Sequence, residues 1–179
     1  PMCGSGTFAI EAALMAKQQA PNLNHDFAAL HWPSFKDKDF QKVLSRCQDM
    51  QKETTTQIQA SDLHPGAVSI CQNNAERADA LDSLAIEQLD IHDLSRPETE
   101  HGGLLILNPP YGSRIGEQKS VLSLWSDIGK LIRSQFMQED NWKTVIVCPD
   151  LASEKALGLT IKRRLIVSHG GSSVNILEI

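Results

Sequence analysis

The sequence lacks the excess of positive charge that a nucleic-acid-binding surface needs. Its 17 lysines and arginines are outnumbered by 22 acidic residues, which gives a formal net charge of −5. Nucleic-acid binding is dominated by neutralisation of phosphates, so a chain of this composition is not expected to hold RNA or DNA by itself. A separate domain would have to supply most of the affinity for nucleic acid.

Cysteine is also scarce, and the four cysteines are scattered without a C-x-x-C pair. The pattern excludes a disulfide framework and a cysteine-based zinc site, and it predicts reduced thiols in a cytosolic protein. His25, His31 and His64 show none of the spacings with cysteine or carboxylate that metal ligands have. The sequence therefore predicts no metal site.

No apolar run approaches the length of a membrane span, and no signal-peptide pattern opens these residues, so we expect no membrane span in them. The remaining composition, 41% hydrophobic and 22% charged over 179 residues, is that of an ordinary globular protein. A chain of this length fits one domain, predicted to cover residues 1–179.

What the sequence does have is a rigid polar turn after an apolar run. Residues 104–107 are all apolar and precede Asn108, Pro109, Pro110 and Tyr111. The run predicts a fully buried strand, and the prolines end it because they lack a backbone N–H. Asn108 would then sit at the carboxyl edge of a sheet, where open α/β folds bind ligands. Two fixed acceptors beside an aromatic ring suit a planar group with an exocyclic amine, whereas a proline turn without function is the alternative.

A glycine loop occupies residues 1–7 and leads directly into a helical pattern. Such a loop presents unpaired N–H groups and the positive end of the helix dipole to a ligand. Gly4, Gly6 and Ala9 also match the dinucleotide fingerprint, so a nicotinamide or flavin enzyme is a second interpretation. A structural loop without a ligand is the third.

Residues 18–53 form a turn-rich and mixed-charge stretch that we interpret as an insertion. A short predicted strand at 57–61 follows it and ends at Asp62, and Pro65 begins a helix. An acid at this strand end can bind ribose hydroxyls or cap the helix. The distance from Gly6 to Asp62 far exceeds the roughly 20 residues of the dinucleotide fingerprint, which counts against a dehydrogenase.

The second half continues the alternation of strands and helices. A strand at 83–87 leads to Asp90 and Ile91, where the acid can accept a hydrogen bond from an adenine amine; Asp93 is the competing residue. Further elements are predicted as a helix at 121–137, a strand at 144–148, a helix beginning near Asp150, and a hairpin of strands at 165–167 and 174–177. This order predicts an α/β fold with a doubly wound, mostly parallel sheet and one antiparallel strand near the C-terminus.

The motifs together resemble one family. Pro-Met-Cys-Gly-Ser-Gly-Thr at residues 1–7, Ser61-Asp62, Asp90-Ile91 and Asn-Pro-Pro-Tyr-Gly at 108–112 resemble the RNA guanine-N2 methyltransferases that carry a THUMP domain, of the bacterial 23S ribosomal RNA type. The resemblance implies a Rossmann-like methyltransferase fold, S-adenosylmethionine as cofactor, and guanine N2 in ribosomal RNA as the methylated amine. It implies a cofactor site at Pro1, Cys3, Gly4, Ser5, Gly6, Thr7, Asp62, Leu63, Asp90, Ile91 and Asn108. It places Asn108, Pro109, Pro110 and Tyr111 at the target base.

Two departures from that family are visible. The THUMP domain, expected to grip the RNA, is absent, and so are the first strand and the acid that normally precede Pro1. We therefore expect this sequence to be the methyltransferase part of a longer protein. The alternatives are an adenine-N6 DNA methylase, which shares the Asn-Pro-Pro-Tyr motif, a nucleotide-binding oxidoreductase, and a Rossmann-like binding domain without catalysis.

Overall fold

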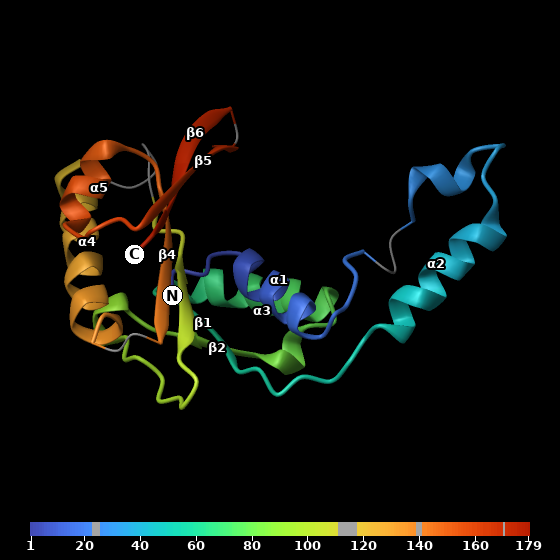
Figure 1. Cartoon of the computed structure of the whole chain (residues 1–179), viewed down its shortest axis with the longest axis horizontal. Helices are drawn as coiled ribbons and strands as arrows, with labels where there is room; N and C mark the ends of the chain where they lie inside the picture. Colours follow the sequence, from blue (N-terminus) through green and yellow to red (C-terminus); the bar gives the residue numbers. More distant parts are fainter. Residues whose placement is uncertain (23–25, 111–117, 139–140, 170) are drawn as a thin grey trace. The chain divides into compact units, whose positions relative to one another are not determined.

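The computed structural model describes residues 1–22, 26–110, 118–138, 141–169 and 171–179 (Figure 1). The chain divides into two units. The larger unit comprises Pro1–Cys3, Ser61–Pro65 and Gln88–Ile179. The smaller unit comprises Gly4–Ala60 and Gly66–Glu87. No helix among the described residues is long and apolar enough to cross a membrane.

The larger unit is built on a four-stranded sheet in the order β3-β4-β6-β5. Its strands are β3 (Gly103–Leu107), β4 (Trp142–Cys148), β5 (Arg163–His169) and β6 (Ser172–Glu178). β3 and β4 run parallel, in a register from Gly103 opposite Trp142 to Leu107 opposite Ile146. β6 is antiparallel to both β4 and β5, so it is the one reversed strand of this sheet. The predicted α/β architecture with a C-terminal antiparallel strand is confirmed.

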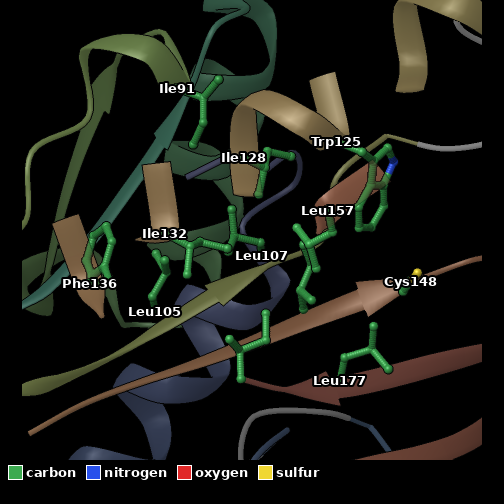
Figure 2. Close-up of a cluster of buried hydrophobic side chains, with 12 residues drawn as sticks. Ile91, Leu105, Leu107, Trp125, Ile128, Ile132, Phe136, Cys148, Leu157 and Leu177 are labelled. Atoms are coloured by element: carbon green, nitrogen blue, oxygen red, sulfur yellow. The ribbon is translucent and has the colours of Figure 1, made fainter. Parts of the chain in front are cut away.

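Helices α4 (Gln118–Leu131) and α5 (Leu151–Leu157) lie beside this sheet (Figure 1). Figure 2 shows Ile128 and Ile132 on the helical side, directed toward Leu105 and Leu107 of β3. α5 begins as predicted, because the Asp150 carboxylate caps it by accepting from Ser153 N–H at 2.8 Å. The buried core of this unit comprises Ile91, Leu105, Leu107, Trp125, Ile128, Ile132, Phe136, Ile146, Cys148, Leu157, Leu177 and Ile179.

Two predictions about this unit are wrong in detail. The run at 104–107 was predicted to be buried on both faces, but Leu104 is 55% exposed whereas Leu105 and Leu107 are buried. β3 therefore alternates between a buried face, with Leu105 and Leu107, and a less buried face, with the exposed Leu104 and the half-buried Ile106. The helix predicted at 121–137 ends its α-helical part at Leu131, and a π-helical turn (η4, Ile132–Phe136) follows. Met137 N–H donates to Ile132 O at 3.0 Å, five residues earlier, as a π-turn requires.

The smaller unit packs α1 (Thr7–Ala16) against α3 (Pro65–Arg77); α1 follows the glycine loop directly and α3 begins at Pro65, both as predicted. Its core consists of Ile10, Ala13, Leu14, Ala75 and Ala80. Cys71 and Ala75 of α3 are buried, whereas the neighbouring Ile70 is 53% exposed, so the buried face of this helix is narrow. Strands β1 (Ile58–Asp62) and β2 (Leu84–Gln88) pair with each other, and the last two residues of β1 belong to the larger unit.

The predicted insertion carries a short helix η1 (Ala28–His31) and the longer α2 (Asp37–Asp49), neither of which has a buried residue. The Phe40 ring contacts the rings of Phe27 and Phe35 edge to face, with centroids 6.2 and 5.6 Å away. At the base of the insertion Lys52 N–H donates to Lys17 O at 2.9 Å. The two ends of this stretch are therefore joined directly.

Candidate functional site

Asn108 follows β3 as an exposed residue between two buried ones. Leu107 is 0% exposed, and the Pro109 side chain is also fully buried. Because both neighbours are fixed in the core, the backbone that carries Asn108 has little freedom. Pro110 is half-buried, and Tyr111, predicted to stack on the target base, lies outside the described residues.

The end of β1 is tied to the end of β2 within the larger unit. Leu89 N–H donates to Asp62 O at 3.0 Å, and Gln88 Nε2 donates to Leu63 O at 3.0 Å. Asp62 Oδ1 accepts from His64 N–H at 3.0 Å, so the carboxylate shapes the turn that leads into α3. Leu63 is 52% exposed beside it. Asp62 is half-buried, so part of this residue stays exposed while its carboxylate forms the turn.

Asp90 caps the short helix η3 (Ile91–Asp93), and its side chain is held from two directions. Its Oδ1 accepts from His92 N–H at 2.9 Å and lies 2.7 Å from His92 Nδ1. Asp93, the competing residue, has an exposed side chain, and its N–H donates to Asp90 O at 3.0 Å. Ile91 belongs to the core at 7% exposure. Asp90 is therefore the acid with a defined orientation at this strand end.

His92 connects Asp90 to α4, a contact that the sequence pattern did not indicate. His92 Nε2 lies 3.5 Å from Asp127 Oδ2, an ion-pair distance rather than a good hydrogen bond. Asp127 Oδ1 in turn accepts from Lys130 Nζ at 2.8 Å. These four residues form a chain of alternating charge along η3 and α4.

The charges in this chain shift one another's protonation. The backbone N–H and then the ring of His92 lower the pKa of Asp90. Lys130, followed by His92, lowers the pKa of Asp127. The hydrogen bond with Asp90, reinforced by Asp127, raises the pKa of His92 above 6.5. The arrangement favours an imidazolium between two carboxylates.

The glycine turn of the smaller unit adopts left-handed backbone conformations. Gly4 has φ +53° and Gly6 has φ +85°, which only glycine adopts without strain. A Cβ on Gly4 would have no atom within 4 Å, so the backbone there is open to close approach by a ligand. A Cβ on Gly6 would overlap Cys71 Sγ. Asn74 Nδ2 fixes the turn by donating to Ser5 O at 2.9 Å.

The residues just before this turn belong to the larger unit. Cys3 N–H donates to Ser61 O at 2.9 Å, which holds Pro1–Cys3 beside the end of β1. Met2 has φ +55° and packs against the larger core. Neither the conformation nor the packing of Met2 was predicted. Thr7, the first residue of α1, lies 3.2 Å from Ser5 through their side-chain oxygens.

The larger unit thus brings together Cys3 with the end of β1, and the ends of β1 and β2 with each other. Gly4, Ser5, Gly6 and Thr7 lie in the smaller unit, where Asn74 and Cys71 of α3 hold their turn. A separate hollow of about 510 Å³ lies where β1 and β2 begin and contains none of the predicted site residues. Within the described ranges, no three His, Cys, Asp or Glu side chains are grouped to bind a metal ion.

Comparison with known proteins gives one consistent family. Residues 1–176 match the model of the RMKL-like methyltransferase domain, UPF0020. The Ribosomal RNA large subunit methyltransferase K/L of Shewanella frigidimarina is 32% identical over 175 residues, covering 95% of this chain and 24% of that protein. The protein of the same name from Pseudomonas savastanoi pv. phaseolicola is 30% identical and covers all of this chain. The chain spans about a quarter of the length of these curated relatives.

Solved structures with the same fold cover 99% of the chain. SMU.472, described as a methyltransferase and crystallised with SAH, is 27% identical with a TM-score of 0.89 over 46% of its own chain. A possible methylase from Clostridium difficile 630 is 26% identical with a TM-score of 0.88, also over 46%. A predicted N6-adenine-specific DNA methylase from Listeria monocytogenes has a TM-score of 0.84 at 23% identity, a likeness of fold alone.

Proposed function

The chain belongs to the family of RMKL-like methyltransferase domains, and from this membership we propose that it transfers a methyl group from S-adenosylmethionine to a base of large-subunit ribosomal RNA. The amine that we propose is the N2 group of a guanine. The observation that carries the assignment to a base amine is Asn108, exposed between the buried Leu107 and Pro109 at the end of β3.

The described residues fit a donor of this chemistry. Open space at the Gly4 Cα lets a ligand approach the backbone of the glycine turn. Among the described residues no side chain caps the start of α1, whose N–H groups suit a carboxylate. We propose that Asp62 accepts from the ribose hydroxyls and that Asp90 accepts from the adenine amine. Leu63, exposed beside Asp62, offers apolar surface to the adenosyl group.

The chemistry supplied by the donor is a methyl group already activated on a sulfonium. The protein therefore needs no strong base, and its contribution is to place and orient the amine. In our proposal the Asn108 side-chain oxygen and the Pro109 carbonyl accept from the amine, which directs the nitrogen lone pair away from them. The base must leave its stack to reach this point, at a cost of a few kcal/mol.

With a net charge of −5, this chain has no excess of positive charge to bind the RNA phosphates, so RNA affinity must come from elsewhere. This chain is about a quarter of the length of its curated relatives. We propose that a THUMP domain in the rest of the protein holds the RNA, whereas residues 1–179 supply the catalytic site.

The test is methyl transfer from labelled S-adenosylmethionine by the complete protein, offered unmodified ribosomal RNA or duplex DNA. We expect label in RNA, located on guanine N2 by nucleoside analysis, and loss of that label with Asn108→Ala. Label in DNA adenine would support the DNA methylase instead. Binding of NAD in preference to S-adenosylmethionine would overturn both.

A further inference from the structure

We propose that His92 is a positioning residue that holds the Asp90 carboxylate in its donor-binding orientation by linking it to Asp127 of α4. The proposal rests on the function proposed above, in which Asp90 accepts from the adenine amine. It assigns a role to a residue outside the recognised motifs of the sequence.

The two carboxylate oxygens of Asp90 differ in their contacts. Oδ1 receives both contacts from His92, the backbone N–H at 2.9 Å and the ring Nδ1 at 2.7 Å. In the part of the chain that the structure describes, Oδ2 makes no hydrogen bond. Fixing Oδ1 therefore fixes the direction in which Oδ2 is presented to a ligand.

The orientation of the His92 imidazole depends on its contact with Asp127. The His92 side chain is 58% exposed, so packing alone does not fix its rotamer. Asp127 is anchored on α4 by Lys130 at 2.8 Å and lies 3.5 Å from Nε2 on the far side of the ring. The ring is thus placed between one carboxylate of η3 and one of α4. A carboxylate behind an imidazole that contacts a functional group is a recurrent way to set ring orientation.

Both contacts of the ring depend on its protonation. Only the imidazolium carries a proton on each ring nitrogen, so only this form attracts both carboxylates. In the neutral ring a proton on Nδ1 leaves the Nε2 lone pair facing Asp127. The charged groups around His92 are Asp90 on its own element, and Asp127 with its partner Lys130 on α4. Loss of the proton should therefore loosen the orientation of Asp90 without unfolding the domain.

The test compares pH profiles of S-adenosylhomocysteine affinity, measured by calorimetry on the complete protein. The variants are His92→Gln, which stays neutral, and Asp127→Asn, which does not touch the ligand. His101→Ala, a substitution at an exposed loop histidine, is the matched control. The measurements run from about pH 5.5, below the ordinary histidine pKa of about 6.5, up to about pH 9. Titration of the ligand is common to all four proteins and cancels between them.

We expect wild-type affinity to fall by about two- to fivefold as His92 loses its proton, the scale of an exposed ion pair. His92→Gln should bind at the weaker level at every pH, and Asp127→Asn should move the step to lower pH. His101→Ala should keep the wild-type profile. Thermal melts at each pH establish that the variants are folded.

Several outcomes would overturn the proposal. A His92→Gln protein that binds with the wild-type pH profile would remove the positioning role, while the methyltransferase assignment would stand. A uniform loss of affinity that keeps the pH step would reduce His92 to a structural residue. Absence of wild-type binding at any pH, by contrast, would remove the proposed function and this inference with it.

Discussion

The Sγ atom of Cys71 on α3 occupies the space that a Cβ on Gly6 would need. The helix side chain thereby dictates glycine at the end of the loop, at a residue whose φ of +85° already favours it. The glycine turn is shaped by packing as well as by the ligand it is proposed to bind.

Gly6→Ala is therefore expected to destabilise the protein by about 2–4 kcal/mol, from the left-handed backbone and from overpacking. Denaturant titration of wild type and variant gives this change in the free energy of unfolding. Cys71→Ala should recover the overpacking part, so the two substitutions should be coupled. Gly4→Ala, also at a left-handed φ but with no atom within 4 Å of its Cβ, should cost only the backbone part of about 1–2 kcal/mol. Equal costs at Gly4 and Gly6 would contradict the packing argument.

Asp62→Ala is expected to weaken S-adenosylmethionine binding by about 1.5–3 kcal/mol, the scale of hydrogen bonds to a charged group. Its effect on unfolding should be smaller, about the 1 kcal/mol of a lost cap. Asp62→Asn is the matched control, because an amide oxygen can still accept from His64 N–H. If Asp62→Ala destabilises the fold while donor affinity is unchanged, Asp62 has only the turn-forming role.

Asn108→Ala in the complete protein is expected to lower the methylation rate by about 10²-fold or more, as loss of one preorganised polar partner does. Donor affinity should stay within a few-fold, because Asn108 is proposed to act on the base. Single-turnover rates and calorimetry separate the two effects. Asn108→Asp should be milder, since a carboxylate also accepts from an amine. A variant that keeps its rate but loses the donor would make this loop part of the cofactor site.

Gly129→Ala is expected to destabilise the larger unit by about 1–3 kcal/mol. A Cβ at this position of α4 would overlap the Leu157 carbonyl oxygen at the end of α5, and backbone atoms yield little. Gly66→Ala, in α3 with nothing within 4 Å, should instead stabilise by about 0.4–1 kcal/mol. Thermal unfolding of the two variants should therefore move in opposite directions, and a shift of the same sign in both would refute the close approach of α4 and α5.

The pair of Lys17 and Asp82, 2.7 Å apart, should give a contribution to stability that depends on pH. The hydrogen bond with Lys17 lowers the pKa of Asp82 below 3.8. The pair therefore stabilises the protein at pH values above the Asp82 pKa of the unfolded chain. This stabilisation is lost as the pH falls through the lower Asp82 pKa of the folded protein. Unfolding free energies of wild type and Asp82→Asn should differ near neutral pH and converge in acid. Glu98→Gln, at an exposed loop position, is the control. If wild type and Asp82→Asn still differ in unfolding free energy below the pKa of Asp82 in the folded protein, the pair with Lys17 is not the cause of the difference.

The local pattern predicted most of the elements because their signals are local. Pro65 begins α3, Asp150 caps α5, and the alternation of strands with helices gives the α/β class. The burial of β3 could not be predicted in the same way. Leu104 and Leu105 are equally apolar, and their different exposure depends on what packs against each face of the sheet.

In the candidate site, too, some residues could be placed from local sequence signals, whereas other contacts depend on tertiary packing. Asp62 ends β1 and Asp90 follows β2, so their positions could be inferred from the sequence alone. The contact of His92 with Asp127 joins residues 35 positions apart and depends on how η3 packs against α4. The π-turn at Ile132–Phe136 was also missed, because an apolar periodicity near 3.6 does not reveal a single five-residue bond.

The hydrogen bond from Lys52 N–H to Lys17 O has a consequence for the tolerance of the chain to changes of length. The two ends of this stretch meet at one point of the smaller unit, so lengthening the stretch adds mainly entropy of loop closure. Doubling such a loop costs only about 0.6 kcal/mol. Insertions and deletions between Lys17 and Lys52 should therefore accumulate more easily than changes in β1 or α1, and whole peptides could be spliced in at this point.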